Sequence, residues 1–302
     1  MSLLMVFVDG FGLGKKDAAV NPLMVAEMPF MRRILDGVTL TVEDVGAGIS
    51  RSDLVIQPTD ATLEVGGIPQ SATGQTALFT GINVAKLTGR HIHGFPTKFL
   101  REILQQDNLL KAINRFGLRA VFANTFTHEY FEAVERGKWR HSVTTTAALA
   151  GGCSLLMLPD LLEGRAVFQD ITNEQLRERG YDVPLLEPET AADYLLNQAV
   201  RNDFTLFEYF QTDRCGHAQN WDLALTILNR LDRFLSKIAE RLVENNLNLV
   251  VVSDHGNIED LMVKTHTFNR VPTIAIGKEA ARFKKVTSLV DIYPIVLNYF
   301  KI

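Results

Sequence analysis

The sequence predicts an α/β protein with a doubly wound, mostly parallel central sheet and helices on both faces. Three observations predict it. Short apolar runs end close to acidic residues, helical patterns lie between these runs, and 46% hydrophobic residues in a chain of 302 provide the apolar material for a large core. Ligands of such sheets bind beyond the carboxyl ends of the strands. We therefore expect the functional residues at the ends of the apolar runs.

Three apolar runs have the composition of buried central strands. They are residues 3–8 before Asp9, residues 204–210 shortly before Asp213, and residues 248–253 before Asp254. Because the carboxyl ends of parallel strands meet at one edge of a sheet, the three carboxylates are expected at the same edge. Two more strands are expected at residues 119–123 and 272–276.

Helical patterns separate the expected strands. The clearest covers residues 222–245, where leucine and isoleucine recur at three- and four-residue spacing, and others cover residues 99–115 and 190–200. Residues 125–190 are less regular and contain scattered prolines. We expect a single domain over residues 1–302, with a lid or insertion over the site at about residues 125–190.

Charge and cysteine content narrow the possible partners and location. A formal net charge of −4 and a pI near 6.0 give no general attraction to nucleic acid or anionic lipid. No stretch approaches the roughly 20 apolar residues that span a bilayer. The N-terminus lacks the basic segment and cleavage site of a secretory signal, and the cysteines are Cys153 and Cys215 alone. We expect a cytoplasmic protein that binds neither nucleic acid nor membrane; no pattern predicts its oligomeric state.

Candidate metal ligands follow the expected strands. Asp213 and His217 are four residues apart, so they share a face if they lie on one helical turn. Asp254 and His255 are adjacent in a loop, and His266 follows soon after. Carboxylate oxygen with imidazole nitrogen suits Zn²⁺ or Mn²⁺. Taken alone, Asp213 and His217 are better explained as an N-cap and a surface histidine, and His266 could be a loop histidine. Three of the seven histidines lie in these segments, however, and this favours metal binding.

The candidate nucleophile lies in residues 69–81. Ser71 is expected at or near the N-cap of a short helix that ends at Gly81. Free backbone N–H groups and the helix dipole would stabilise an alkoxide or a phosphoryl group there. The alternative is an ordinary N-cap. Thr73 and Thr76 remain rival nucleophiles, because a hydroxyl needs activation and no pattern shows which one receives it.

As a set, these motifs resemble the metalloenzyme branch of the alkaline phosphatase superfamily. The resemblance is strongest to the phosphatase-like core of cofactor-independent phosphoglycerate mutase and of phosphopentomutase. The shared order appears here as Asp9-Gly10, Ser71-Ala-Thr-Gly74, Asp213-Arg-Cys-Gly-His217, Asp254-His-Gly-Asn257 and His266-Thr267. These motifs span nearly the whole chain, and their order is specific only as a set.

The resemblance implies two divalent cations, Mn²⁺ or Zn²⁺, and a small phosphate ester as substrate. It assigns Asp213, His217 and His266 to one cation. It assigns Asp9, Asp254 and His255 to the other, with Ser71 bridging toward it. It also implies that Ser71 is the nucleophile and forms a phosphoserine intermediate, because Ser71 stands three residues before Gly74.

Two features depart from the mutases. Gln75 follows Gly74 where the mutases have a histidine, and the chain between Ser71 and Asp213 is too short to hold a large second domain beside the core elements. A mutase must keep its dephosphorylated intermediate away from water. We therefore expect a phosphatase, with a phosphomutase as the alternative. A metal-binding protein that has lost catalysis is the least favoured reading, because the ligand set is complete.

Residues outside the metal ligands are expected to select the substrate. Arg90, His91 and His93, together with Arg140, are the candidates, because arginine suits bidentate recognition of phosphate. The alternative is that the arginines are solvated at the surface and that the two histidines belong to a structural loop.

Overall fold

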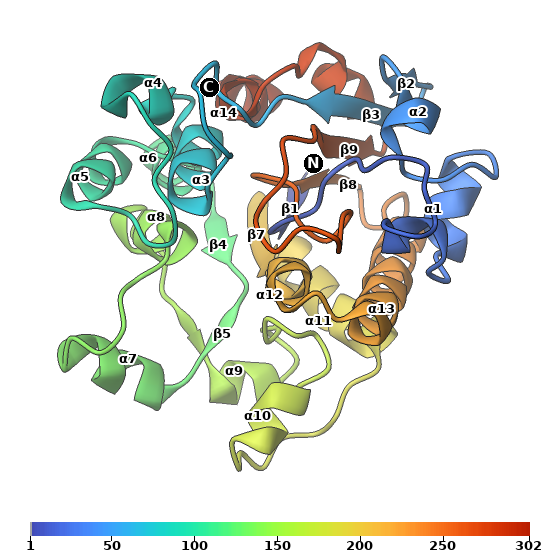
Figure 1. Ribbon diagram of the computed structural model, residues 1–302. Helices are drawn as coiled ribbons and strands as arrows, with labels where there is room; N and C mark the ends of the chain where they lie inside the picture. Colours follow the sequence, from blue (N-terminus) through green and yellow to red (C-terminus); the bar gives the residue numbers. More distant parts are fainter. Residues whose placement is uncertain (1) are drawn as a thin grey trace.

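The computed structural model describes residues 2–302, and a seven-stranded sheet forms its centre (Figure 1). Strands β4, β7, β1 and β8 are parallel, whereas β9 pairs antiparallel with β8 and β3, and β2 pairs antiparallel with β3. The expected mostly parallel sheet is thus confirmed. The order across the sheet is β2 (Ile49–Ser50), β3 (Leu54–Thr59), β9 (Val271–Ile276), β8 (Leu247–Val252), β1 (Ser2–Val8), β7 (Phe204–Tyr209) and β4 (Ala120–Phe122).

The three strands expected to precede acidic residues are neighbours at the centre of the sheet. Strand β1 lies between β7 and β8, with Val8 opposite Tyr209 and Phe7 opposite Val252. All three run in the same direction, so their carboxyl ends open at one edge. This register brings Asp9, Asp213 and Asp254 together.

Both faces of β1 are buried, because alternate side chains of a strand point to opposite faces. Leu4 and Val6 belong to one core cluster, and Met5 and Phe7 belong to the other. The second cluster is covered by α3 (Ser71–Thr80), α4 (Val84–Thr88), α5 (Lys98–Gln106), α6 (Leu109–Arg115), α8 (Val143–Ala150) and α14 (Ile292–Phe300). The first is covered by α1 (Pro29–Ile34), α2 (Val42–Val45), α11 (Pro188–Ala199), α12 (Gln211–Ala218) and α13 (Trp221–Glu240).

The helix expected over residues 99–115 is two helices, α5 and α6. Asp107 between them is extended, with φ −157° and ψ 150°. Asn108 then caps α6 by accepting from the Lys111 N–H at 3.1 Å, and its side-chain amide donates to Leu104 O at 2.9 Å. Both helices bury leucine and isoleucine in the same core cluster. The hydrophobic pattern of residues 99–115 is therefore continuous, although the helix itself is interrupted at Asp107 and Asn108.

Residues 125–190 contain both core and peripheral elements. Helix α8 is buried over most of its length and packs against α5 and α6 in the main core. A small parallel sheet of β5 (Thr125–Phe126) and β6 (Leu156–Met157) lies outside the main sheet. It is accompanied at the lower edge of Figure 1 by α7 (His128–Glu135), α9 (Leu158–Leu162) and α10 (Glu174–Glu178).

Short 3₁₀ helices complete the chain as η1 (Pro22–Met24), η2 (Ala280–Lys285) and η3 (Leu289–Asp291). Among the helices of residues 2–302, none is both long and apolar enough to cross a bilayer.

Candidate metal centre

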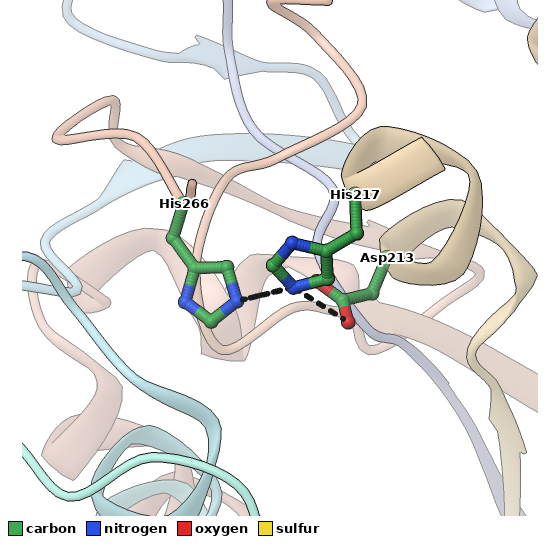
Figure 2. Close-up of side chains that lie close together, drawn as sticks. All are labelled: Asp213, His217 and His266. Atoms are coloured by element: carbon green, nitrogen blue, oxygen red, sulfur yellow. Dashed lines mark hydrogen bonds and ion pairs between the residues drawn. The ribbon is translucent and has the colours of Figure 1, made fainter. Parts of the chain in front are cut away.

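Asp213, His217 and His266 converge beyond the carboxyl edge of the sheet (Figure 2). Asp213 and His217 project from consecutive turns of α12, and His266 comes from the loop before β9. Asp213 Oδ2 lies 3.5 Å from His217 Nε2, and Asp213 Oδ1 lies 3.4 Å from His266 Nε2. The three ligands assigned to one cation thus present their donor atoms to a common point.

Hydrogen bonds at the far side of both imidazoles fix which ring nitrogen carries the proton. His217 Nδ1 lies 2.9 Å from Lys264 O, and His266 Nδ1 lies 2.8 Å from Pro69 O. A carbonyl only accepts, so both Nδ1 atoms donate, and each ring in its neutral form has its lone pair on Nε2. These two Nε2 atoms are nevertheless only 3.1 Å apart. Two lone pairs at this distance repel each other, and a cation between the two Nε2 atoms would remove the repulsion. A hydrogen bond from the other ring nitrogen is usual for metal-binding histidines.

A second group of ligands lies next to the first. His255 Nε2 is 3.3 Å from Asp9 Oδ1 and 3.5 Å from Asp254 Oδ2. Asp213 also belongs to this group, because its carboxylate lies within reach of Asp9 and His255. Asp9 Oδ1 is buried and has no hydrogen-bond donor within residues 2–302. Such an orphaned carboxylate oxygen is a ready ligand for a cation.

The pKa values of the clustered carboxyl and imidazole groups are shifted by burial and by their mutual contacts. Burial, reinforced for Asp9 by the Asp254 and Asp213 carboxylates, raises the pKa of both Asp9 and Asp254. Burial also lowers the pKa of His255. Burial opposes ionisation of Asp213 too, but its contacts with His266 and His255 hold its pKa below the usual range. Burial thus opposes the charging of Asp9, Asp254 and His255 in the absence of a cation, whereas carboxylate and neutral imidazole are the forms that bind divalent cations.

Two glycines of the motifs allow the segments of the site to approach closely. Gly10 has φ +68°, and a Cβ there would lie 2.8 Å from Asp213 Cα. A Cβ on Gly74 would lie 2.8 Å from the Asp254 carbonyl oxygen. Any other residue at position 74 would push α3 away from the β8 end and carry Ser71 with it.

Ser71 is the first residue of α3, and Gln70 occupies the N-cap position. The Ser71 hydroxyl lies 2.9 Å from His255 Nε2. The rival hydroxyls lie elsewhere: Thr76 is fully buried and donates to Ala72 O, and Thr73 donates to Gln70 O. Of the three hydroxyl residues, Ser71 alone lines the cavity described below.

Two amide side chains hold the carboxylates of the site. Gln75 Nε2 donates to Asp9 Oδ2 at 3.2 Å and to Asp254 Oδ2 at 3.0 Å, so the residue that departs from the mutase pattern bridges two proposed ligands. Asn257 Nδ2 donates to Asp213 Oδ1 at 2.7 Å. The sequence predicted no role for either side chain, although Gln75 directly follows one motif and Asn257 ends another.

Two buried glutamates near the site were also missed. Glu259 is fully buried and ties the loops after β1 and β8 together, accepting from Gly12 N, Asn257 N and the side chains of Thr267 and Asn269. Glu208 lies in β7 and accepts from Thr144 Oγ1 at 2.6 Å. Burial raises the pKa of Glu208 to about 7. Glu208 could have been recognised from the sequence, because it is the only charged residue in an apolar strand and stands five residues before Asp213.

A cavity of about 430 Å³ opens at this edge of the sheet and is lined by Asp9, Ser71 and Asp213. Among the substrate-binding candidates, Arg140 lines the cavity. Arg90 and His93 are exposed and do not belong to its lining, and neither does His91. His91 Nδ1 instead lies 3.4 Å from Thr73 Oγ1, on the side of α3 away from Ser71. This part of the loop therefore contacts α3 at Thr73, while Phe95 further along the same loop lines the cavity.

This fold and these converging ligands define a metal-dependent enzyme with an alkaline phosphatase-like α/β core. A family model described as the metalloenzyme superfamily matches residues 1–302, and the chain belongs to this superfamily. The resemblance in the motifs is thereby confirmed. Superfamily membership implies divalent metal ions, and the two ligand groups provide places for them.

Curated relatives include 2,3-bisphosphoglycerate-independent phosphoglycerate mutases. The chain is 30% identical to the mutase of Mycoplasma pneumoniae over 146 residues, which are 43% of this chain and 28% of the mutase. It is 29% identical to the mutase of Francisella philomiragia over 132 residues, which are 39% of this chain and 26% of the mutase. The matched regions thus cover about a quarter of each mutase's length.

Solved structures share the fold at low sequence identity. A Pyrococcus horikoshii protein matches with a TM-score of 0.58 and 14% identity, covering 98% of this chain and 96% of its own. The alkaline phosphatase of the Antarctic bacterium TAB5 matches with a TM-score of 0.53 and 13% identity, covering 99% of this chain and 98% of its own. At these identities the likeness concerns the fold.

Proposed function

We propose that this protein is a phosphatase that hydrolyses a small phosphate monoester through a phosphoserine on Ser71. The observation that carries the proposal is the position of Ser71. Its hydroxyl lies at the first turn of α3, lines the cavity, and is 2.9 Å from His255 Nε2 within the ligand cluster. A nucleophile, an anion-stabilising helix terminus and a candidate metal centre therefore meet at one point.

The cluster would hold two divalent cations, Mn²⁺ or Zn²⁺. Asp213, His217 and His266 would hold one. The other would be held by Asp9, Asp254 and His255, with Ser71 beside it. When bound, such cations lower the pKa of a serine hydroxyl and neutralise charge on the attacking and leaving oxygens of an in-line displacement.

Hydrolysis would proceed in two steps. In the first, Ser71 Oγ loses its proton and bonds to phosphorus while the ester P–O bond breaks, and the released alkoxide takes up a proton as an alcohol. In the second, water bonds to phosphorus, the Ser71 O–P bond breaks, and Ser71 recovers a proton as inorganic phosphate leaves. Gln75 and Asn257 keep the carboxylates in place, and the first turn of α3 stabilises the phosphoryl anion.

Hydrolysis is favoured over isomerisation by the exposure of the cavity rim. Trp139 and Arg140 line the cavity and are exposed, so water has access to the side opposite the sheet. We interpret the peripheral part of residues 125–190 as a small lid, which leaves a phosphoserine open to water. The likeness to phosphoglycerate mutases favours a phosphomutase as the second candidate.

An isotope experiment separates the two candidates. Metabolite phosphomonoesters are first screened for phosphate release with Mn²⁺ and with Zn²⁺. A reactive ester is then turned over in ¹⁸O-labelled water, and the products are analysed by mass spectrometry. A phosphatase places label in free phosphate. An isomeric phosphoester formed without phosphate release and without label would establish the mutase instead.

A further inference from the structure

Aromatic rings from separate segments line the cavity that reaches Ser71. They are Phe95 from the loop before α5, Phe126 in β5, Tyr130 in α7, Trp139 after α7, and Phe168 from the loop before α10. Segments that are far apart in the sequence thus contribute the same kind of side chain to one concave surface. The site already described uses none of these rings.

Three of the rings form a cluster, and two of the five rings are open to solvent. The ring centroids of Phe126 and Tyr130 are 5.1 Å apart, and those of Tyr130 and Trp139 are 5.8 Å apart. Trp139 is 48% exposed and Phe95 is 42% exposed. The Arg140 guanidinium lies over the Phe95 ring at 4.9 Å. Part of this apolar surface is exposed beside the proposed active site. A flat ligand that covers it would bind with a more favourable free energy, because water is removed from the aromatic rings.

Polar groups of the same cavity can also bind a ligand. Thr125 is only 5% exposed, and its hydroxyl has no hydrogen-bond partner within residues 2–302. Arg140, Arg179 and Arg214 line the cavity and form no ion pair with the described carboxylates. The occupant should therefore combine an apolar face with an anionic group and a polar atom.

We propose that the substrate is a phosphomonoester whose alcohol carries a planar aromatic ring. The ring is bound against Tyr130 and Trp139, and the phosphoryl group lies at Ser71. This inference rests on the proposed function and makes Tyr130 and Trp139 specificity-determining residues. We call the five rings Phe95, Phe126, Tyr130, Trp139 and Phe168 the aromatic wall. A three-carbon phosphoacid would occupy only the part of the cavity next to the candidate metal centre and leave the aromatic wall in water, whereas an aromatic alcohol would cover it.

Three esters with primary alcohol leaving groups test the inference: benzyl, cyclohexylmethyl and propyl phosphate. Aromatic contact favours a ring by about 0.5–1.5 kcal/mol beyond burial, so kcat/KM for benzyl phosphate should exceed that for cyclohexylmethyl phosphate roughly 3- to 10-fold. Propyl phosphate, which reaches fewer rings, should be the poorest substrate. Equal kcat/KM for all three esters would overturn the inference while leaving the phosphatase function intact.

A variant pair shows whether the aromatic wall is responsible. In Trp139→Ala the ratio of kcat/KM for benzyl phosphate to that for propyl phosphate should fall roughly tenfold. Phe116→Ala is the matched control, because Phe116 is 56% exposed and does not line the cavity. Its ratio should equal that of the wild type. An unchanged ratio in Trp139→Ala would overturn the inference.

Binding of non-hydrolysable analogues separates this inference from the proposed function. Calorimetric titration of the metal-loaded protein should show benzylphosphonate binding several-fold more tightly than cyclohexylmethylphosphonate, and Trp139→Ala should remove the difference. If the analogues bind in this order but no ester is hydrolysed, the aromatic site stands and the phosphatase function is wrong. Equal affinities would refute the aromatic site, whatever the turnover.

Discussion

Asp213 connects the two groups of ligands. Its carboxylate contacts His217 and His266 on one side and lies within reach of Asp9 and His255 on the other. The hydrogen bond from Asn257 fixes the carboxylate in this position. Asp213 is therefore the one residue of the described chain that belongs to both candidate ligand groups.

Ser71→Ala should abolish turnover, with kcat lowered roughly 10³-fold or more, because the covalent step requires the hydroxyl. The variant should keep its fold and at least one metal, since the Ser71 side chain is only partly buried. Steady-state assay and thermal melting of the same preparation measure both. Ser50→Ala, at an exposed position of β2, is the control. Full activity in Ser71→Ala together with loss in Thr73→Ala would move the nucleophile to Thr73.

Gln75→Ala should weaken metal binding about 10- to 100-fold, which is the usual effect of removing a group that orients metal ligands. The reason is that the amide of Gln75 holds both Asp9 and Asp254. Metal titration followed by calorimetry measures the affinity. Gln106→Ala, at the exposed end of α5, should bind metal as the wild type does. Identical affinities in the two variants would show that Gln75 does not orient the ligands.

At the level of elements, β7 delivers two kinds of carboxyl group to the site. Its end leads into α12 and therefore to Asp213, while Glu208 near its end is buried inside the strand. Thr144 on α8 donates to Glu208 and opposes the effect of burial. Burial is the larger effect, so the pKa of Glu208 rises from 4.5 to about 7.

This shift predicts how the stability of the metal-free protein depends on pH. The folded state holds the Glu208 proton up to a pKa of about 7, whereas the unfolded state releases it near 4.5. The unfolded state therefore binds fewer protons between these values, and the stability from this group is lost as pH rises through that window. Between pH 5 and pH 8, the free energy of unfolding should fall by about 2.5 kcal/mol more in the wild type than in Glu208→Gln.

Urea unfolding with a chelator at both pH values tests this prediction. Glu208→Gln keeps the size of the side chain and removes its titration, so the difference between the two proteins isolates this group from Asp9 and Asp254. Glu244→Gln, at an exposed position, is the control and should follow the wild type. Parallel pH profiles for the wild type and Glu208→Gln would contradict the assigned shift.

For the whole molecule, we expect two divalent metals per chain, because the ligands otherwise form a buried cluster of like charges. Elemental analysis should give a stoichiometry of two, and His266→Ala should lower it to about one. His128→Ala, at an exposed position outside the cluster, should keep both metals. A metal-loaded structure with His266 remote from Asp213 and His217 would refute the assignment.

Removal of the metals should destabilise the whole fold, since the proposed ligands come from α12 and from loops along most of the chain. At a free metal concentration 100-fold above Kd, each site stabilises the folded state by about 2.7 kcal/mol if the unfolded chain does not bind metal. Melting temperatures with and without chelator measure the loss, and readdition of Mn²⁺ or Zn²⁺ should reverse it. A melting temperature that does not depend on metal would contradict tight binding to the folded state.

The sequence by itself determined the fold class and the edge of the sheet where the ligands meet. Apolar runs report that a strand is buried on both faces, and the residue after each run then lies at a strand end. Leucine spacing likewise located α13 to within a few residues. These features depend on local burial, which a hydrophobic pattern records directly.

The tertiary structure alone decided which groups contact one another. Asn108 splits a continuous helical pattern, Gln75 bridges two carboxylates that are distant in the chain, and Arg90 and His93 do not line the cavity. The aromatic wall is likewise assembled from separate segments. Hydrophobic periodicity shows that a side chain is buried but not what it packs against, because the partner is set by strand order and loop path.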